Sequence, residues 1–325
     1  MHRASAALIL ALVVSAGALA PVASAAADSA GWSIGPTAAA DGGTRANFDY
    51  AVDPGTSVTD AITVRNDGAT ALALRIYPAD AFTTREGNID VLTSGTASAD
   101  AGTWIALGTS TLTLDPGEAQ SVPFTVTVPA DARPGDHPAG IVTSLVTDDA
   151  AAQVQVDRRL GSRMQIRVSG ELVPAVEVSD PQVSFSGSWN PLAVGFVSVG
   201  YTLQNTGNTR VTAIADAVVA GPFGIVPVNS APVQLPEVLP GSTIDVSERL
   251  DGIGALLWLT GAVQVQPSSV GFGAATLDPV RAEFTVPAVP FAALLILLAV
   301  AGVAVVVLLL ARRRAASTSP VDPRQ

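Results

Sequence analysis

The feature that most constrains this chain is an uncharged apolar segment near its C-terminus. Residues 288–311 carry no charged side chain over 24 positions, and three arginines follow directly. As a helix, 24 residues extend about 36 Å, and the hydrocarbon core of a bilayer is about 30 Å thick. We therefore predict a transmembrane helix over 287–311, with the basic tail 312–325 in the cytoplasm by the positive-inside rule. No LPxTG-like pentapeptide precedes Pro287, as a sorting signal for covalent attachment to the cell wall would require.

The N-terminus contains a second apolar segment, which predicts a secretory signal peptide. A basic start precedes an apolar run over 6–20, and small residues follow it. This order is typical of a signal peptide, here 1–27, cleaved after Ala25 or Ala27. An uncleaved N-terminal anchor is the alternative. Together the two apolar ends predict a single-pass protein of the cell membrane, with an extracellular region over 28–286.

This extracellular region is acidic and almost without the side chains that metal sites and catalytic triads need. Its 27 Asp and Glu against 12 Arg give a net charge of about −15, which disfavours nucleic acid as a partner. The chain has no cysteine, which excludes a disulfide scaffold and a cysteine zinc site. All 17 basic residues are arginine, and with the alanine excess this indicates a GC-rich, actinobacterial source.

Between the apolar ends, the sequence pattern predicts β-strands. Short alternating runs bounded by turn residues recur with almost no helical periodicity. In the first half these runs are 61–65, 71–77, 111–114, 122–128, 141–146, 154–156 and 164–168. Strands of this length and spacing are typical of antiparallel sandwiches.

One strand–turn–strand unit occurs twice. Asn66-Asp67-Gly68 separates two of these runs, and Asn205-Thr206-Gly207 separates the runs 197–204 and 211–214, 139 positions later. We expect each turn to close a hairpin, with its residues at positive φ.

Pro-Gly pairs precede further strands, at Pro54-Gly55, Pro116-Gly117 and Pro240-Gly241. Proline at the second and glycine at the third position predict type II turns. The fold class that follows is all-β: two tandem Ig-like antiparallel β-sandwiches, 28–173 and 174–286, and then one C-terminal transmembrane helix. Each core depends on burial alone, which suffices for a domain above about 100 residues.

The sequence lacks the motifs of catalysis. After removal of His2 with the signal peptide, His137 is the remaining histidine, and a triad would pair it with Asp136 and a serine. Nothing resembles a nucleophile elbow, an oxyanion loop, a Walker loop or a dinucleotide-binding glycine motif. We therefore interpret His137 as a loop histidine beside prolines, and we predict a protein that is not an enzyme and has no cofactor or metal.

Two groups of side chains are candidates for ligand binding. The first is the one basic cluster of the extracellular region, Arg158, Arg159, Arg163 and Arg167. Two of its arginines alternate with apolar residues on one predicted strand, so one face would be cationic and the other buried. These arginines could bind carboxylates of peptidoglycan stem peptides or a partner's acidic surface, or they could pair with nearby acids. The second group is Trp104 and Trp189, as aromatic faces for a sugar ligand or as core residues.

Several motifs, taken in order, resemble the WxL-interacting protein family. They are Asn47-Phe48-Asp49-Tyr50, Pro54-Gly55, the Val64–Gly68 turn, Pro134-Gly135-Asp136-His137 and Arg167-Val168-x-Gly170. The resemblance covers residues 30–173 and concerns the family's N-terminal peptidoglycan-binding, Ig-like domain. It implies a second Ig-like domain, which this chain matches in layout only, and a membrane helix with a basic tail. The family's lysine-rich character is missing, which indicates a divergent actinobacterial branch.

These observations predict a membrane-anchored cell-surface protein that binds peptidoglycan non-catalytically and scaffolds other surface proteins. Two weak attachments, to the wall and to the membrane, raise the effective concentration at the wall without a high-affinity site. The alternative is a structural or assembly module that contacts partner surface proteins by β-edge addition, without direct wall binding.

Overall fold

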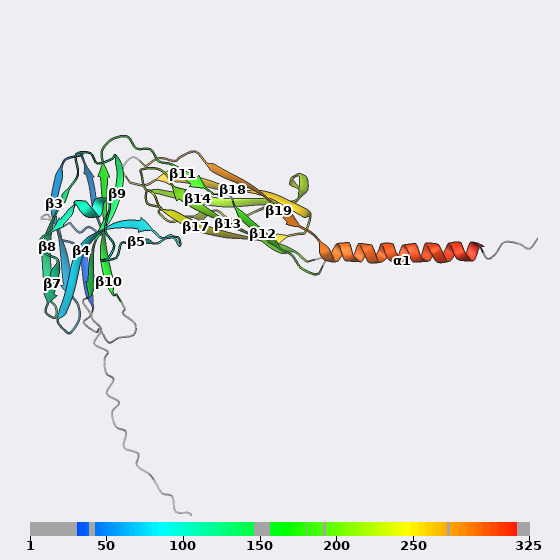
Figure 1. The fold of residues 1–325 in the computed structure, drawn as a ribbon, viewed down its shortest axis with the longest axis horizontal. Coiled ribbons are helices and arrows are strands. Elements are labelled where there is room, and N and C mark those ends of the chain that lie inside the picture. Colours follow the sequence, from blue (N-terminus) through cyan, green and yellow to red (C-terminus); the bar gives the residue numbers. More distant parts are fainter. Residues whose placement is uncertain are drawn as a thin grey trace, which may run out of the picture.

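A computed structural model of the chain describes residues 31–38, 43–145, 157–179, 181–190, 193–271 and 274–316. The predicted signal peptide and the predicted strand 154–156 lie outside the described residues. Two β-sandwiches follow one another along the long axis of the molecule, and one helix extends from the far end of the second (Figure 1). The prediction of an all-β chain with two Ig-like sandwiches and one C-terminal apolar helix is confirmed.

The first sandwich consists of a four-stranded sheet, in the order β1-β3-β8-β6, and a six-stranded sheet, in the order β2-β10-β9-β4-β5 with β7 also paired to β4. Among its described pairings, β10 with β2 is parallel and the others are antiparallel. Its elements are β1 (Trp32–Pro36), β2 (Phe48–Val52), β3 (Ser57–Asn66), β4 (Leu72–Thr83), β5 (Ile89–Val91), the 3-10 helix η1 (Ala101–Trp104), β6 (Ile105–Leu107), β7 (Thr111–Leu114), β8 (Ala119–Thr127), β9 (Gly135–Leu145) and β10 (Arg159–Val168).

The second sandwich repeats the two-layer plan with antiparallel pairs. One sheet has β13 at its centre, with β11 and β12 on one side and β17 on the other, and the second sheet has the order β15-β14-β18-β19 with β16 also paired to β14. Its elements are β11 (Val176–Val178), β12 (Gln182–Ser186), β13 (Gly195–Asn205), β14 (Val211–Ala220), the 3-10 helix η2 (Pro222–Gly224), β15 (Val228–Asn229), β16 (Val233–Gln234), β17 (Thr243–Ile253), β18 (Leu257–Ser269) and β19 (Val280–Ala288).

Alternating burial along the strands builds a separate core in each sandwich. On β10, Met164, Ile166 and Val168 are fully buried, whereas Arg163 and Arg167 on the opposite face are partly exposed. Burial of one such apolar side chain contributes about 1.5–3 kcal/mol. Gln165, on the same face as the arginines, is also buried, so this face is not a uniformly solvated cationic surface.

The Asn-x-Gly turns connect the two sheets of each sandwich and do not close hairpins. β3 and β4 belong to different sheets, and so do β13 and β14, so the hairpin prediction was wrong in both places. Neither Gly68 nor Gly207 has a positive φ. Instead, the Oδ1 of Asn66 accepts the Gly68 N–H at 2.9 Å, and the Oδ1 of Asn205 accepts the Gly207 N–H at 3.0 Å. Each asparagine therefore forms an Asx turn with its own chain.

Asn66 and Asn205 occupy equivalent corners of the two sandwiches. Both side chains are completely buried. Each Nδ2 donates to two main-chain carbonyls, at distances between 2.7 and 3.0 Å. The asparagines satisfy carbonyls that a buried corner would otherwise leave without a partner. The internal repeat in the sequence is thus a repeat of structure.

The predicted type II turns are confirmed. Gly55, Gly117 and Gly241 have φ values of 78°, 76° and 75°. In each turn the residue after the glycine donates its N–H to the carbonyl three positions earlier, at 3.0 to 3.2 Å. A residue with a Cβ would be strained at these glycines by about 1–2 kcal/mol.

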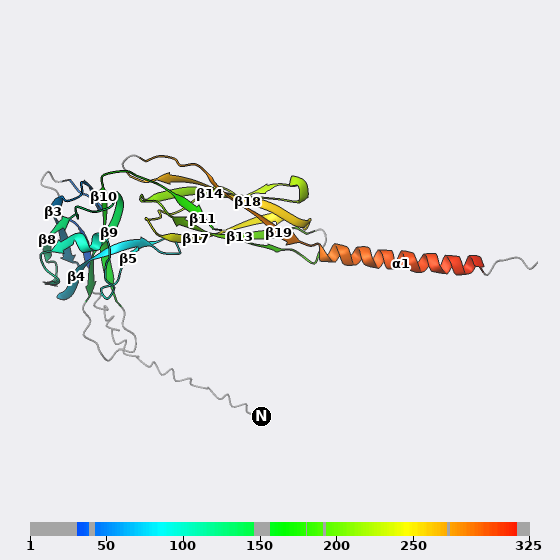
Figure 2. The same cartoon turned by 45° about the horizontal axis from the view of Figure 1, so that its top comes forward.

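Helix α1 (Phe291–Ala316) is long and apolar enough to span a membrane. Its large apolar side chains are exposed around the whole circumference, unlike a core helix, which buries one stripe. The helix begins at Phe291 and not at 287, because Pro287 and Ala288 still pair with β18. Figure 2, turned from the view of Figure 1, shows α1 directed away from both sandwiches.

Candidate functional site

The two sandwiches are joined by hydrogen bonds and ion pairs centred on Asp136. Its side chain is 2% exposed, and its two oxygens accept from Nε and Nη2 of Arg167 at 2.6 and 2.7 Å. From the second sandwich, the main-chain N–H of Arg210 donates to the same carboxylate at 2.8 Å. The hydrogen bond to Asp136 is the main reason that the pKa of Arg167 is raised above its ordinary value.

Glu237 extends this network. Its carboxylate lies 3.2 Å from Nη1 of Arg163 in the first sandwich and 3.2 Å from Nη1 of Arg210 in the second. Arg167 also donates to the carbonyl of Val270 at 2.9 Å. Two predicted ligand arginines, Arg163 and Arg167, thus connect the two sandwiches.

The end of β4 and the turn after it make a second set of contacts across the junction. The buried Thr83 accepts the N–H of Leu239 at 3.0 Å and donates its hydroxyl to the Glu237 carbonyl at 3.1 Å. Arg85 pairs with Asp245 at 3.0 Å. These contacts, together with the Asp136 network, fix one sandwich relative to the other.

A cleft of about 780 Å³ lies beside this junction. The first sandwich contributes Asp100, Arg133 and His137 to its lining, and the second contributes the corner loop 204–208. Asn208 of this loop donates to the carbonyls of Pro134 and Glu171, both at 2.9 Å. The cleft therefore depends on the relative position of the two sandwiches.

His137 is part of β9 and does not lie in a loop, which corrects the sequence interpretation. It is 7% exposed, its Nδ1 lies 2.8 Å from the Asp100 carboxylate, and its Nε2 lies 2.8 Å from the Arg133 carbonyl. Burial lowers the pKa of His137, but the hydrogen bonds to these two acceptors outweigh burial and the pKa is raised. Since both nitrogens face acceptors, the imidazolium satisfies both, and neither nitrogen is positioned to activate a nucleophile.

Trp104 lies beside His137, with the ring centroids 4.7 Å apart. The side chain is partly buried against the first core. Its indole therefore packs against His137, which lines the cleft.

The two remaining arginines of the cluster lie away from the cleft. The guanidinium of Arg158 is 5.5 Å from the ring centroid of Trp32. The Nε of Arg159 is 3.4 Å from Asp157, and although burial lowers the pKa of Arg159, its contacts with Tyr77 and nearby acids raise it overall. Trp189 is 79% exposed near the start of α1. The six predicted residues do not form one binding surface.

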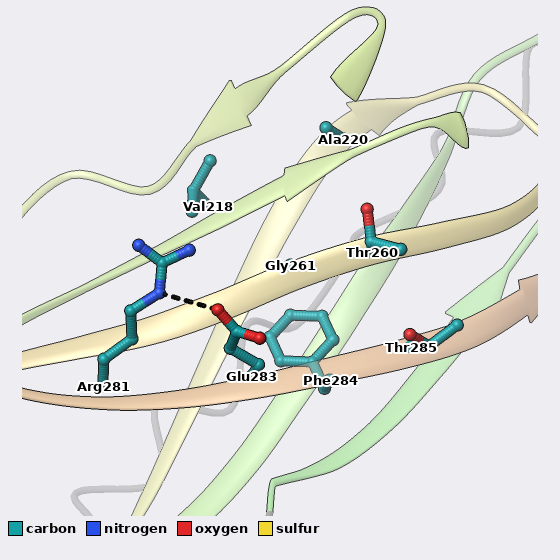
Figure 3. Close-up of a pocket in the computed structure, with 8 residues that line it drawn as sticks. All are labelled: Val218, Ala220, Thr260, Gly261, Arg281, Glu283, Phe284 and Thr285. Carbon is teal, nitrogen blue, oxygen red and sulfur yellow. Dashed lines mark ion pairs between the residues drawn. The ribbon is translucent and has the colours of Figure 1, made fainter. Parts of the chain in front are cut away.

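A hollow of about 590 Å³ lies on the second sandwich beside Gly261 (Figure 3). The ring of Phe284 occupies the space of a side chain at position 261, because a Cβ there would lie 2.6 Å from it. At the rim, Arg281 and Glu283 form an exposed ion pair at 3.3 Å. Among the described residues, no group of three His, Asp or Glu could hold a metal ion here or elsewhere.

Sequence reasoning missed Asp100, Arg210 and Glu237. Their partners lie 27 to 74 positions away in the sequence, so no local pattern connects them. The one sequence signal for these residues was that Arg210 follows shortly after the repeated turn at Asn205.

No protein-family model matches the chain, and no curated protein matches it. Solved structures with a similar fold include a chaperone–tip adhesin complex of CFA/I fimbriae biogenesis, at 12% identity and a TM-score of 0.39 over 80% of this chain and 100% of that one. The class 5 fimbriae chaperone CfaA is 12% identical, with a TM-score of 0.36 over 79% of this chain and 100% of that one. The E. coli chaperone DraB is 12% identical, with a TM-score of 0.32 over 78% of this chain and 98% of that one. At such values the likeness carries no argument about function.

Proposed function

We propose that this protein is anchored in the cell membrane by α1 and binds peptidoglycan non-catalytically in the cleft between its sandwiches, as a divergent member of the WxL-interacting protein family. The lining of the cleft is the observation that carries the proposal. It combines the exposed Arg133, the Asp100 carboxylate and the main chain of the corner loop 204–208 around about 780 Å³. This volume lies within the range of about 300–1,000 Å³ that is usual for ligand pockets.

The chemistry of the cleft suits a stem peptide. Peptidoglycan stem peptides carry carboxylates and amides, and a guanidinium can bind a carboxylate through two parallel hydrogen bonds. Main-chain groups of the corner loop can pair with amides. Both ring nitrogens of His137 already have acceptors, the Asp100 carboxylate and the Arg133 carbonyl, and this supports binding without catalysis.

The helix gives the second attachment. The three arginines at 312–314 follow the apolar part of α1, so the positive-inside rule orients the sandwiches outward. A molecule held in the membrane meets the wall at high effective concentration, which compensates for weak binding in an open cleft.

Co-sedimentation of the full chain, in detergent micelles, with isolated actinobacterial cell walls tests the proposal. Arg133→Ala should lower the affinity about tenfold or more, because a hydrogen bond to a charged group contributes about 1.5–3 kcal/mol. Arg65→Ala is the matched control, since Arg65 is an exposed arginine on β3 whose partner is Asp67. Sedimentation of Arg65→Ala should equal that of the unchanged chain. A chain that stays in the supernatant, or equal losses in both variants, would refute wall binding in the cleft.

Strand β17 favours a second candidate, the binding of a surface protein by β-edge addition. Among the described strands this 11-residue strand pairs with β13 alone, so no strand pairs with its other edge. The N–H of Asp245 on this edge donates to the Arg85 carbonyl at 2.8 Å. Alternate residues of an antiparallel edge strand face the same way, so the N–H of the exposed Ser247 also points outward.

Ser247→Pro removes one outward donor and leaves the bonds to β13. Proline is tolerated on an edge strand at such a position. If a partner adds to this edge, the variant should lose a protein that co-purifies with the full chain from envelopes, while wall binding is unchanged. Retention of every co-purifying protein would count against edge addition.

A further inference from the structure

The end of the second sandwich next to α1 exposes large apolar side chains. Trp189 is 79% exposed, Phe223 99%, Val226 66%, Leu257 50% and Trp258 41%. They come from three places that are distant in sequence: the connection from β12 to β13, the connection from β14 to β15 through η2, and the start of β18. We call these five residues the apolar end.

Strand register places the apolar end at the start of α1. Leu257 and Trp258 pair with Ala288 and Pro287, the last residues of β19. Trp189 lines a hollow of about 330 Å³ together with Pro290 and Phe291, the first residue of the helix. In Figures 1 and 2 the curl that contains η2 lies at the same end of the sandwich from which α1 emerges.

The connection between β19 and α1 keeps this end close to a bilayer. Residues 289 and 290 alone separate Ala288 from Phe291, so the gap is at most about 11 Å even for an extended chain. The interfacial layer outside the hydrocarbon core is about 5–8 Å thick on each side. A membrane that holds α1 would therefore lie close to the end of the sandwich where β19 ends.

The charge pattern favours lipid over a protein partner at this end. The extracellular region carries a net charge of about −15, yet residues 185–200, 217–236 and 252–277 contain no charged side chain, and the charges just before the third segment, Arg249 and Asp251, pair with each other. The uncharged sequence continues through the end of β19 into the helix, over 284–311. Exposed aromatic residues without neighbouring charges are typical of a membrane interface, where Trp is enriched.

The backbone at the apolar end is strained. Within the described residues, the non-glycine residues with positive φ are Phe223, Val226 and Leu257, at 59°, 50° and 74°. This conformation is costly for residues with a Cβ, and most of all for a β-branched valine. Backbone strain of this kind clusters at functional positions, where the surroundings maintain it. Here all three strained residues are exposed and apolar.

We propose that the apolar end docks on the outer leaflet of the membrane that α1 crosses, with Trp189, Phe223 and Trp258 among the headgroups and upper acyl chains. This inference rests on the proposed anchoring by α1. The docked sandwich does not pivot about residues 289–290, so the cleft at its other end is held away from the membrane and toward the wall.

Tryptophan quenching tests the docking. The full chain is reconstituted into phosphatidylcholine vesicles with or without bromine on acyl carbons near the headgroup. Trp32→Phe/Trp104→Phe retains the tryptophans of the apolar end, and the matched control Trp189→Phe/Trp258→Phe retains those of the first sandwich. Brominated lipid should lower the fluorescence of the first variant about twofold, because its indoles lie in the interface, and leave the control unchanged. Phe223→Asp, at a fully exposed position, should reduce the quenching of the first variant.

Flotation of the same vesicles on a density gradient separates the two proposals. If the chain does not float with the lipid, anchoring by α1 fails and docking fails with it. If the chain floats and the two double variants are quenched equally or not at all, anchoring stands and docking is overturned. Cross-linked dimers together with unquenched tryptophans would assign the apolar end to contact between two copies and would also overturn docking on lipid.

Discussion

Replacement of Asp136 by alanine should strongly destabilise the junction between the sandwiches. The carboxylate is 2% exposed and accepts from Nε and Nη2 of Arg167 and from the main-chain N–H of Arg210. The Arg167 side chain, 12% exposed, would keep its charge without this partner. Removal of one member of a buried ion pair costs about 3–5 kcal/mol, because an uncompensated charge remains.

Calorimetry of the full chain in detergent measures this loss. For a unit of 150–250 residues, 1 kcal/mol corresponds to about 2–4 °C in Tm, so Asp136→Ala should lower the Tm by about 6–20 °C. The matched control is Glu283→Ala, which breaks the exposed ion pair between Arg281 and Glu283. Their side chains are 55% and 76% exposed. Pairs of this kind contribute about 0–1 kcal/mol, so the control should move the Tm by only a few degrees.

A second substitution tests the reason for the loss. In the Asp136→Ala background, Arg167→Met removes the uncompensated guanidinium and should recover part of the stability, since buried ion pairs can be replaced by apolar residues at little cost. If Asp136→Ala costs no more than Glu283→Ala, or if Arg167→Met adds a further full loss, the reasoning about a buried junction is wrong.

Two other predictions concern His137 and the asparagine corners. NMR should show His137 titrating above the ordinary histidine pKa, and Asp100→Asn should lower that pKa. Its stabilising contribution is complete below about pH 6.5 and is lost as the pH rises through the raised pKa, so a Tm that is constant over this range would contradict the assignment. In urea unfolding, Asn66→Ala and Asn205→Ala should each cost about 1–3 kcal/mol for every carbonyl left unpaired, whereas the exposed Asn88→Ala should stay within about 0.5 kcal/mol. Equal losses of unfolding free energy in all three variants would show that the hydrogen bonds of Asn66 and Asn205 do not stabilise the fold.

The sequence predicted the parts of the fold that depend on residues close together in the chain. The Pro-Gly turns were predictable because proline fixes φ and glycine alone accepts positive φ without strain, and Gly55, Gly117 and Gly241 have that conformation. The buried face of β10 was predictable because strand side chains alternate. The apolar helix followed from its composition.

The candidate site was hardly predictable, because it depends on contacts distant in sequence. An Asn-x-Gly turn between alternating runs predicts a hairpin, but the buried Asn66 and Asn205 bond across their sandwiches and place the flanking strands in different sheets. Arg163 pairs with Glu237, which only the packing of the second sandwich brings near, and Arg167 pairs with Asp136 on the neighbouring strand β9. The sequence predicts a loop at His137 because its strand contains proline and glycine, which normally end strands.

The continuity of β19 with α1 has a mechanical consequence. The strands of the second sandwich run along the long axis of the molecule, and α1 continues that axis (Figure 1). β19 pairs with β18 over nine positions, and inter-strand hydrogen bonds lie perpendicular to the strands. If the chain is attached to both wall and membrane as proposed, tension between them would load these bonds in shear, all together, and would not peel them apart one by one. A protein held at both ends would resist such a pull best in this arrangement.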